Sequence, residues 1–343
     1  MSLSEVAQIA GVSLSTVSRY VKGQLKLSAS TEQRVLEAIE EVGYRRPERE
    51  SSGRVGLIVP DLENPYFAEL AGAVSLAGAS MGHHVLVSVS RANAARESLL
   101  VREHAKMAGL AGLFYVGMNP RNSALAKTAN EMPVVMLDER VETGDPGTGP
   151  IPFVGADDYA GSFMATQFLI RQGHERIGHV AGPRELNSSK TRIRGYKAAL
   201  EAHGLPFDES LVFSGPYSER FGASVLTYIT RLDPPITAVF VASDIVAVGL
   251  LATSSLYGVK VPDNLSVVGY DGIALANWLT PRLTTVRQPI RDIARTGYEQ
   301  LAALIQGQAT RSFELPMELE VRESTTPLAT QAPVAGRVSP LLG

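Results

Sequence analysis

From Val55 onward, short apolar runs alternate with amphipathic helical segments, and this pattern leaves few possible folds. Each run is continuously apolar, which is typical of parallel strands that are covered on both faces. Helical segments between such strands make the crossovers of a doubly wound α/β structure. The runs are Val55–Pro60, Val85–Val89, Gly112–Gly117, Val134–Leu137, Ile177–Ala181, Ala238–Ala242 and Leu265–Tyr270.

The α/β pattern covers residues 55–327, which is too long for a single sheet of this kind, so we expect two similar lobes with parallel sheets. Residues 1–44 differ, because they contain three short helical patterns and no apolar run typical of a strand. The charged segment 45–54 contains Pro47 and Gly53 and is predicted to be a linker. Residues 328–343 have no periodicity, and we expect a disordered tail there.

The composition excludes several classes of protein. The chain has no cysteine, which rules out disulfides, thiolate metal sites and cysteine nucleophiles. Its 32 basic and 35 acidic residues give a net charge of −3, so no uniformly basic surface for nucleic acid exists. The N-terminus does not resemble a secretion signal, and no apolar stretch is long enough to span a membrane, so we expect a cytoplasmic protein. The histidines lack partners at metal-ligand spacing, and we expect neither metal nor cofactor.

The first two helical patterns have the spacing of a helix-turn-helix. One runs from Leu3 to Ala10, and the second begins after Ser13, with Gly11 in the turn. Val6, Ile9 and Val17 are predicted to pack between the helices. Small hydroxyl groups near a helix N-terminus suit phosphate and base contacts, and an arginine can bind guanine. The predicted DNA-binding residues are Ser13, Leu14, Ser15, Thr16, Ser18 and Arg19. An α-hairpin whose second helix happens to be rich in serine remains the alternative.

The segment from Leu3 to Arg19 resembles the headpiece signature of the lactose-repressor (LacI) and purine-repressor family of bacterial transcription regulators. The resemblance continues to about residue 327, and the order and spacing of its motifs make it specific. The further motifs are Glu37 to Tyr44, Asn64-Pro65-Tyr66-Phe67, Gly173-His174-Glu175-Arg176-Ile177, Arg192-Ile193-Arg194-Gly195-Tyr196, Val267-Val268-Gly269-Tyr270-Asp271 and Leu283-Thr284-Thr285-Val286. It implies a helix-turn-helix headpiece on a two-lobed core like that of periplasmic binding proteins.

The linker departs from the family pattern. Family members carry a hinge helix between headpiece and core, with a leucine that wedges into the minor groove of the DNA. Here the segment from Arg45 to Arg54 is about six residues too short and contains no leucine. Because a wedge of this kind needs a large apolar side chain, we do not expect the hinge mechanism. Instead, we expect the short linker to couple core and headpiece by limiting the reach of the headpiece.

Polar and aromatic residues follow the predicted strands where ligands bind in such folds. Carboxylates that accept from hydroxyl groups, a guanidinium that donates and aromatic faces are the groups that a polyol needs. From their position we select Asn64, Tyr66, Phe67, Asp138, Ser188, Arg192, Ser243 and Asp271. The resemblance implies effector contacts for Arg192 and Asp271, and it adds Tyr217 and Gln288 as candidates.

Several of these residues also have structural interpretations. Tyr66 and Phe67 can be core aromatics, and Arg192 can pair with a carboxylate at the surface. Asp158 and Asp244 each stand at a predicted helix start, so we expect them to cap helices. Trp278, the single tryptophan, is expected to contribute to packing, with a place at the border of the pocket as the alternative.

These observations predict a transcriptional regulator, a repressor, that binds a pseudo-palindromic operator as a homodimer and a small metabolite between its lobes. We expect a sugar, although a purine, an amino acid or a phosphosugar would also be compatible with the sequence. The alternatives are an enzyme or a sugar-binding protein on the same scaffold. Against an enzyme, the sequence has no dinucleotide-binding, phosphate-binding or nucleophile-elbow motif.

Overall fold

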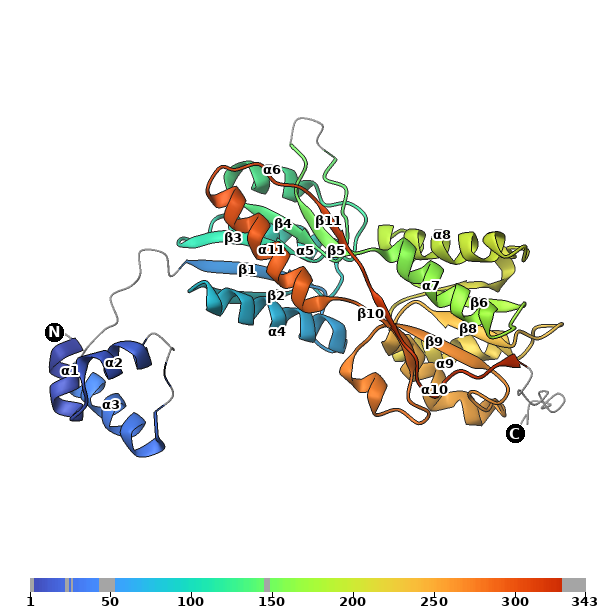
Figure 1. Ribbon diagram of the computed structural model, residues 1–343. Coiled ribbons are helices and arrows are strands. Elements are labelled where there is room, and N and C mark those ends of the chain that lie inside the picture. The colour runs from blue at the N-terminus through green and yellow to red at the C-terminus, as the bar shows by residue number, and fades with distance from the viewer. Residues whose placement is uncertain (1–2, 22–24, 26, 43–52, 145–148, 329–343) are drawn as a thin grey trace, which may run out of the picture. The chain divides into compact units, whose positions relative to one another are not determined.

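The computed structural model describes residues 3–21, 25, 27–42, 53–144 and 149–328 (Figure 1). The chain divides into two compact units, residues 1–52 and 53–343. Most of the predicted linker, residues 45–52, and of the predicted tail, residues 329–343, lies outside the described residues. Arg54, which we assigned to the linker, is the first residue of strand β1. Leu328, which we assigned to the tail, donates its backbone N–H to the carbonyl of Gln172 at 2.9 Å.

The first unit contains the three predicted helices, α1 (Leu3–Ala10), α2 (Leu14–Val21) and α3 (Ala29–Val42). The turn between α1 and α2 needs a left-handed residue, and Gly11 supplies it with φ +64°. Ser13 caps α2, because its Oγ accepts from the backbone N–H of Thr16 at 3.1 Å. Ile9 was wrongly predicted to pack between the helices, since it is exposed. The buried apolar core consists of Val6, Ala7, Ala10, Val17, Val35 and Ala38.

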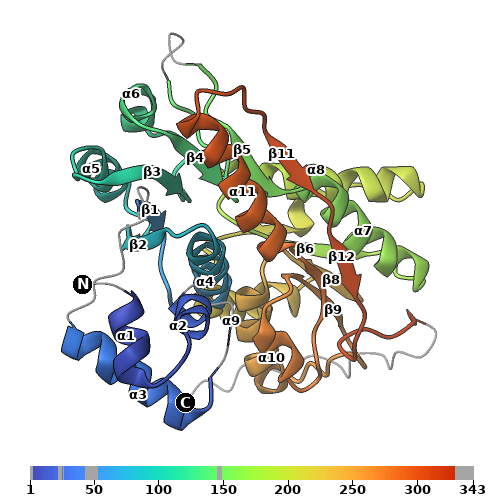
Figure 2. The ribbon, with the colours of Figure 1, turned by 60° about the vertical axis from the view of Figure 1, so that its left-hand side comes forward.

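The second unit has two lobes, each built on a six-stranded sheet. In the first lobe the strand order is β11-β5-β4-β3-β1-β2 and all pairs are parallel. Helix α4 packs against α11, helix α5 packs against α6, and Figure 2 shows the two pairs on opposite faces of this sheet. The elements of this lobe are β1 (Arg54–Val59), α4 (Pro65–Ser80), β2 (His84–Val89), α5 (Ala94–Ala105), β3 (Leu110–Tyr115), α6 (Ser123–Glu131), β4 (Val134–Leu137), β5 (Phe153–Ala156), α11 (Ile290–Ile305) and β11 (Phe313–Leu315).

In the second lobe the strand order is β12-β10-β9-β8-β6-β7, and only the β10–β12 pair among these strands is antiparallel. Helix α7 packs against α8, and α9 packs against α10. The elements are α7 (Asp158–Arg171), β6 (Ile177–Ala181), α8 (Asn187–Ala202), η1 (Glu209–Leu211), β7 (Val212–Ser214), α9 (Glu219–Ile229), β8 (Ala238–Val241), α10 (Asp244–Ser254), η2 (Ser255–Tyr257), β9 (Ser266–Asp271), η3 (Ala274–Asn277), β10 (Thr284–Arg287) and β12 (Glu318–Glu320).

The chain passes between the lobes three times. It leaves the first lobe after β5, returns after β10 to form α11 and β11, and crosses again to add β12 to the second lobe. Figure 2 shows β11 and β12 as one red segment that runs from one lobe into the other. Both lobes are therefore discontinuous in sequence, and three connections hold them beside each other.

The predicted fold class is confirmed, and each predicted apolar run forms a strand, namely β1, β2, β3, β4, β6, β8 or β9. The apolar pattern did not predict β5, β7, β10, β11 and β12, which have only three or four residues each. No helix within the described part of the chain is long and apolar enough to cross a membrane.

Candidate functional site

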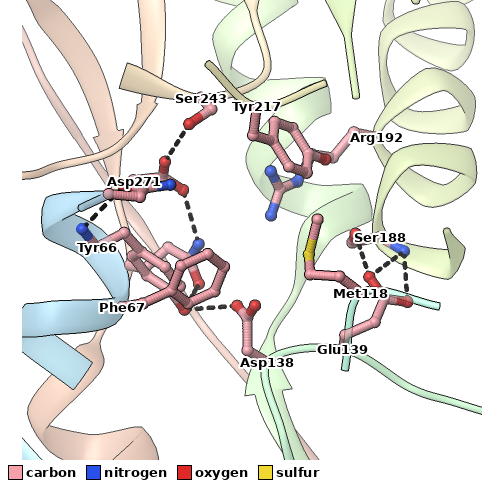
Figure 3. Close-up of a pocket in the computed structure, with 12 residues that line it drawn as sticks. Tyr66, Phe67, Met118, Asp138, Glu139, Ser188, Arg192, Tyr217, Ser243 and Asp271 are labelled. Carbon is pink, nitrogen blue, oxygen red and sulfur yellow. Dashed lines mark hydrogen bonds between the residues drawn. The ribbon is translucent and has the colours of Figure 1, made fainter. Parts of the chain in front are cut away.

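All ten residues predicted to bind an effector line one pocket between the two lobes, together with Met118 and Glu139 (Figure 3). Most of these side chains follow the carboxyl ends of parallel strands or stand in the first turns of α4 and α8, which is where ligands bind in open α/β sheets. The first lobe contributes Asn64, Tyr66, Phe67, Met118, Asp138 and Glu139, and the second contributes Ser188, Arg192, Tyr217, Ser243, Asp271 and Gln288.

The start of α4 fixes the aromatic wall of the pocket. Asn64 caps this helix, because its Oδ1 accepts from the backbone N–H of Tyr66 at 3.1 Å. The Tyr66 hydroxyl donates to Asp138 Oδ1 at 2.5 Å and lies 3.0 Å from Gln288 Oε1. Phe67 meets the Tyr66 ring edge to face, with 5.3 Å between centroids. Both rings are buried and belong to the apolar core as well as to the pocket, so both interpretations of these residues describe their positions.

Two pocket carboxylates stand on left-handed backbone. Asp138 has φ +65° and Asp271 has φ +117°, each at the end of a buried strand. Side chains rarely adopt such angles, and where they do the surroundings usually hold them in place at a functional site. Asp271 is held by Ser243 Oγ, which donates to its Oδ2 at 2.8 Å, and by Gln288 Nε2, which donates to its Oδ1 at 3.0 Å.

Burial makes these carboxylates hard to ionise. It raises the pKa of Asp138 to about 6, although the Tyr66 hydrogen bond and the Arg192 charge act in the opposite direction. Burial also raises the pKa of Asp271, again against the effect of Arg192. When they are ionised, the three carboxylates that line the pocket, Asp138, Glu139 and Asp271, outnumber its one cation, Arg192.

Arg192 is the cation of the pocket, and two of its five N–H donors bind groups of the protein. Its Nε donates to Asp158 Oδ1 at 2.8 Å, and its Nη1 donates to the carbonyl of Ala242 at 2.7 Å. The guanidinium carbon lies 4.0 Å from the centroid of the Tyr270 ring. The side chains of Arg192 and Asp158 are only 6% and 12% exposed, so the pair is buried and does not lie at the surface.

Asp158 and Asp244, the two aspartates expected to cap helices, bind other groups instead. Asp157, one residue earlier than Asp158, caps α7 by accepting from the N–H of Ala160 at 2.9 Å. Asp244 accepts from the N–H groups of Gly272 and Ile273 at 2.8 and 3.0 Å, as well as from the hydroxyl of β10 residue Thr285. Both interpretations as helix caps were wrong, because Asp158 orients Arg192 and Asp244 fixes the loop after Asp271.

Trp278 was expected to contribute to packing, with a place at the border of the pocket as the alternative, and both predictions were wrong. It follows η3, is 84% exposed, and does not line the pocket.

Glu139 and Met118 line the pocket but were not predicted from the sequence. Glu139 follows Asp138 directly, and its carboxylate accepts from the first amides of α8, as described below. Met118 is placed by its backbone, whose N–H donates to the buried carboxylate of Glu97 at 3.1 Å. Glu139 could have been predicted as a pocket residue, because it is a second acid after the same strand as Asp138. Met118 could not, because its side chain has no polar group of the kind used to select the candidates.

The predicted DNA-binding residues gather at the start of α2. Leu14, Ser15 and Arg19 are exposed there, and Thr16 and Ser18 are half-buried. The Ser13 hydroxyl lies 2.8 Å from that of Ser15 and 2.7 Å from that of Thr16, so the helix begins with a hydrogen-bonded hydroxyl cluster. This surface offers hydroxyl groups, an apolar side chain and a guanidinium, which are the groups that contact phosphates and base edges.

Comparisons with known proteins identify the family. Residues 2–47 match the model of "Bacterial regulatory proteins, lacI family", and residues 166–325 match that of "Periplasmic binding protein-like domain". The HTH-type transcriptional regulator DegA of Bacillus subtilis (strain 168) is 31% identical in an alignment that covers 96% of this chain and 99% of DegA. The chain belongs to the lacI family.

Two solved structures support this assignment over nearly the whole lacI-family chain. The complex of the transcriptional regulator CelR with cellobiose has a TM-score of 0.72 and 30% identity, covering 94% of this chain and 99% of CelR. The lac repressor dimer bound to operator and the anti-inducer ONPF has a TM-score of 0.71 and 25% identity, covering 95% and 99%.

The resemblance inferred from sequence motifs is thereby confirmed, and the protein is a lacI-family transcriptional regulator. Within the described residues, no group of three histidine, aspartate or glutamate side chains is arranged to hold a metal ion.

Proposed function

We propose that this regulator represses transcription by binding a pseudo-palindromic operator as a homodimer, and that a sugar bound between the lobes controls its affinity for the operator. The observation that carries the proposal is the pocket, where carboxylates, a guanidinium and aromatic rings from both lobes converge. Hydroxyl groups of a sugar can donate to Asp138 and Asp271, while the C–H face of its ring can pack on Tyr66 or Phe67. The solved relative with cellobiose supports a sugar as the ligand class.

A thermal-shift screen tests the sugar. The purified full-length chain is heated with neutral mono- and disaccharides, purines and amino acids, each in large excess. A ligand at 100 times its Kd adds about 2.7 kcal/mol to the free energy of unfolding and raises the melting temperature. A shift with purines alone would contradict the assignment of a sugar.

The DNA site is proposed from the exposed start of α2. An arginine that donates to a guanine contributes about 1–3 kcal/mol of discrimination against the wrong base. Arg19→Ala is therefore expected to weaken binding to the cognate operator by that amount and binding to random DNA only slightly. Gel shifts with both DNAs measure the difference. Equal losses on both DNAs would assign Arg19 to phosphate contact instead.

A homodimer is supported by large apolar side chains exposed on the core, including Leu76, Tyr228, Leu256 and Trp278. Contact with a second copy of the chain would remove the apolar area of such side chains from water. The relative solved on operator DNA, the lac repressor, is a dimer. Sedimentation at micromolar concentration checks this proposal, and a stable monomer bound to operator would contradict it.

Coupling between the sites is proposed to depend on the length of the linker, most of which lies outside the described residues. A ligand changes DNA affinity only if it favours one arrangement of the core, and a short linker transmits that arrangement to the headpiece. A flexible Gly-Ser insertion between Ser51 and Ser52 is expected to weaken effector control of DNA binding while leaving effector affinity unchanged. Unchanged control would favour direct contact between headpiece and core.

The relative DegA is a transcriptional regulator, and we propose that this chain likewise releases its ligand chemically unchanged and needs no cofactor. We also propose that it acts in the cytoplasm, where the operator DNA lies. Incubation with each binding sugar followed by chromatography tests for turnover.

A further inference from the structure

One carboxylate of the first lobe closes the start of a helix in the second. Glu139 follows β4, and its Oε1 accepts from the backbone N–H of Asn187 at 2.9 Å and from that of Ser188 at 3.2 Å. Its Oε2 accepts from the Ser188 hydroxyl. Figure 3 shows the bonds between Glu139 and Ser188 at one side of the pocket. Glu139 is only 2% exposed, so the contact between the lobes is shielded from water.

The helix needs this acceptor because it has no cap of its own. The residue before α8 is Leu186, whose side chain forms no capping hydrogen bond. The first amides of a helix lack partners inside the helix and carry a partial positive charge, which favours an anion there. In this protein the anion is the side chain of Glu139, so the first turn of α8 is already occupied.

The remaining charges of the pocket do not favour an added anion. Asp138, Glu139 and Asp271 line it together with one cation, Arg192. That cation already donates to Asp158 and to a backbone carbonyl, and its face lies on the ring of Tyr270. Burial raises the pKa of Asp138 to about 6 and that of Glu139 to about 7, so these carboxylates are ionised at pH 8. At that pH a phosphate or carboxylate entering the pocket meets like charges at short range, in a buried place where water screens them poorly.

We propose that the pocket selects uncharged effectors over anionic ones, and that Glu139 is the side chain that imposes this selection. It does so in two ways: it places a like charge beside the ligand, and it occupies the helix amides that would otherwise bind a phosphate. This inference rests on the proposed function, and it narrows the effector from sugars in general to sugars without a phosphate or carboxylate group.

Two substitutions separate these two effects. Glu139→Gln removes the charge and keeps an oxygen that accepts from the α8 amides, whereas Glu139→Ala removes both. Glu185→Gln is the matched control, because Glu185 is exposed and stands just before α8 but does not line the pocket. Circular dichroism and melting curves of the full-length variants establish that each is folded.

The probes are inorganic phosphate and two matched pairs, ribose with ribose 5-phosphate and glucose with glucose 6-phosphate, measured by calorimetry. The native chain and Glu185→Gln are expected to bind none of the phosphates in the millimolar range. At pH 8, Glu139→Gln is expected to gain about tenfold in phosphate affinity because a like charge is removed from beside the ligand. Glu139→Ala is expected to gain more, since its helix amides are also free to donate charge-assisted hydrogen bonds to the phosphate.

The outcomes separate this inference from the proposed function. Binding of either sugar phosphate to the native chain, or no gain in phosphate affinity in both Glu139 variants, overturns the selection against anions. A gain in phosphate affinity in the variants supports it, whether or not ribose or glucose binds. The proposed function depends separately on the wider screen of neutral sugars described above.

Discussion

The buried pair of Arg192 and Asp158 allows a sharp test of how the pocket is held together. Replacing Arg192 with methionine leaves the Asp158 carboxylate buried, with the Tyr270 hydroxyl 2.7 Å away but no cation paired to it. Removing one partner of a buried ion pair costs about 3–5 kcal/mol, because the remaining charge is left without compensation. We therefore expect Arg192→Met to lower the free energy of unfolding of the ligand-free chain by that amount.

The second substitution is expected to restore stability instead of lowering it further. In the double variant Arg192→Met/Asp158→Asn neither member of the pair is charged, and apolar or neutral replacements of a buried pair are often close to neutral. The double variant should therefore be more stable than Arg192→Met alone. A double variant no more stable than the single one would refute the reasoning, because the loss would then come from packing and not from an unpaired charge.

Urea unfolding followed by far-ultraviolet circular dichroism measures these free energies. Tryptophan fluorescence is unsuitable, since Trp278 is 84% exposed and changes its surroundings little on unfolding. The control is Arg295→Met, which removes surface pairs with Asp292 and Glu299, whose side chains are 57% and 50% exposed. Pairs of that kind contribute about 1 kcal/mol or less, so this variant should unfold nearly like the native chain.

Three further predictions concern single positions. Burial raises the pKa of Asp138 to about 6, so the stability that comes from its protonated form is full below about pH 4 and is lost as the pH rises through 6. The melting temperature of Asp138→Asn should therefore rise relative to that of the native chain between pH 4 and pH 7. Gly249→Ala should lower the free energy of unfolding in urea by about 3 kcal/mol, since the added Cβ would lie 1.9 Å from the backbone oxygen of Glu219. Gly72→Ala, with open space around it, should instead raise this free energy by up to about 1 kcal/mol. Val17→Ala should destabilise the isolated headpiece by about 1.5 kcal/mol, because two buried methyl groups are lost, and a melt of residues 1–52 measures this.

The sequence predicted the strands that carry long apolar runs and missed those that do not. β5 has only four residues, and β11 and β12 have three each, with glutamates among them. Segments this short have no period of their own, and they form strands because a neighbouring strand supplies the hydrogen bonds. Their pairing with distant segments is a property of the folded chain that local pattern does not contain.

The pocket was easier to predict than the contacts inside it. Polar residues after parallel strands converge at one edge, so position alone selected Asp138 and Asp271. Partners separated by many residues were not predictable in this way. Glu139 binds Ser188 of α8 across 49 residues, and Asp158 binds Arg192 across 34. Local pattern therefore favoured a helix cap for Asp158, which was wrong.

The three crossings between the lobes affect how the protein is made on the ribosome. The first lobe begins at β1, yet α11 packs on its strands and β11 pairs with β5, where Ser312 Oγ accepts from the N–H of Phe153 across 159 residues. During synthesis the strands from β1 to β5 therefore emerge long before the helix that covers one side of their sheet. Part of the apolar surface of the nascent first lobe therefore stays uncovered until nearly the whole chain has been translated. Chaperones that bind such surface should engage this protein early and release it only after residue 315 has emerged.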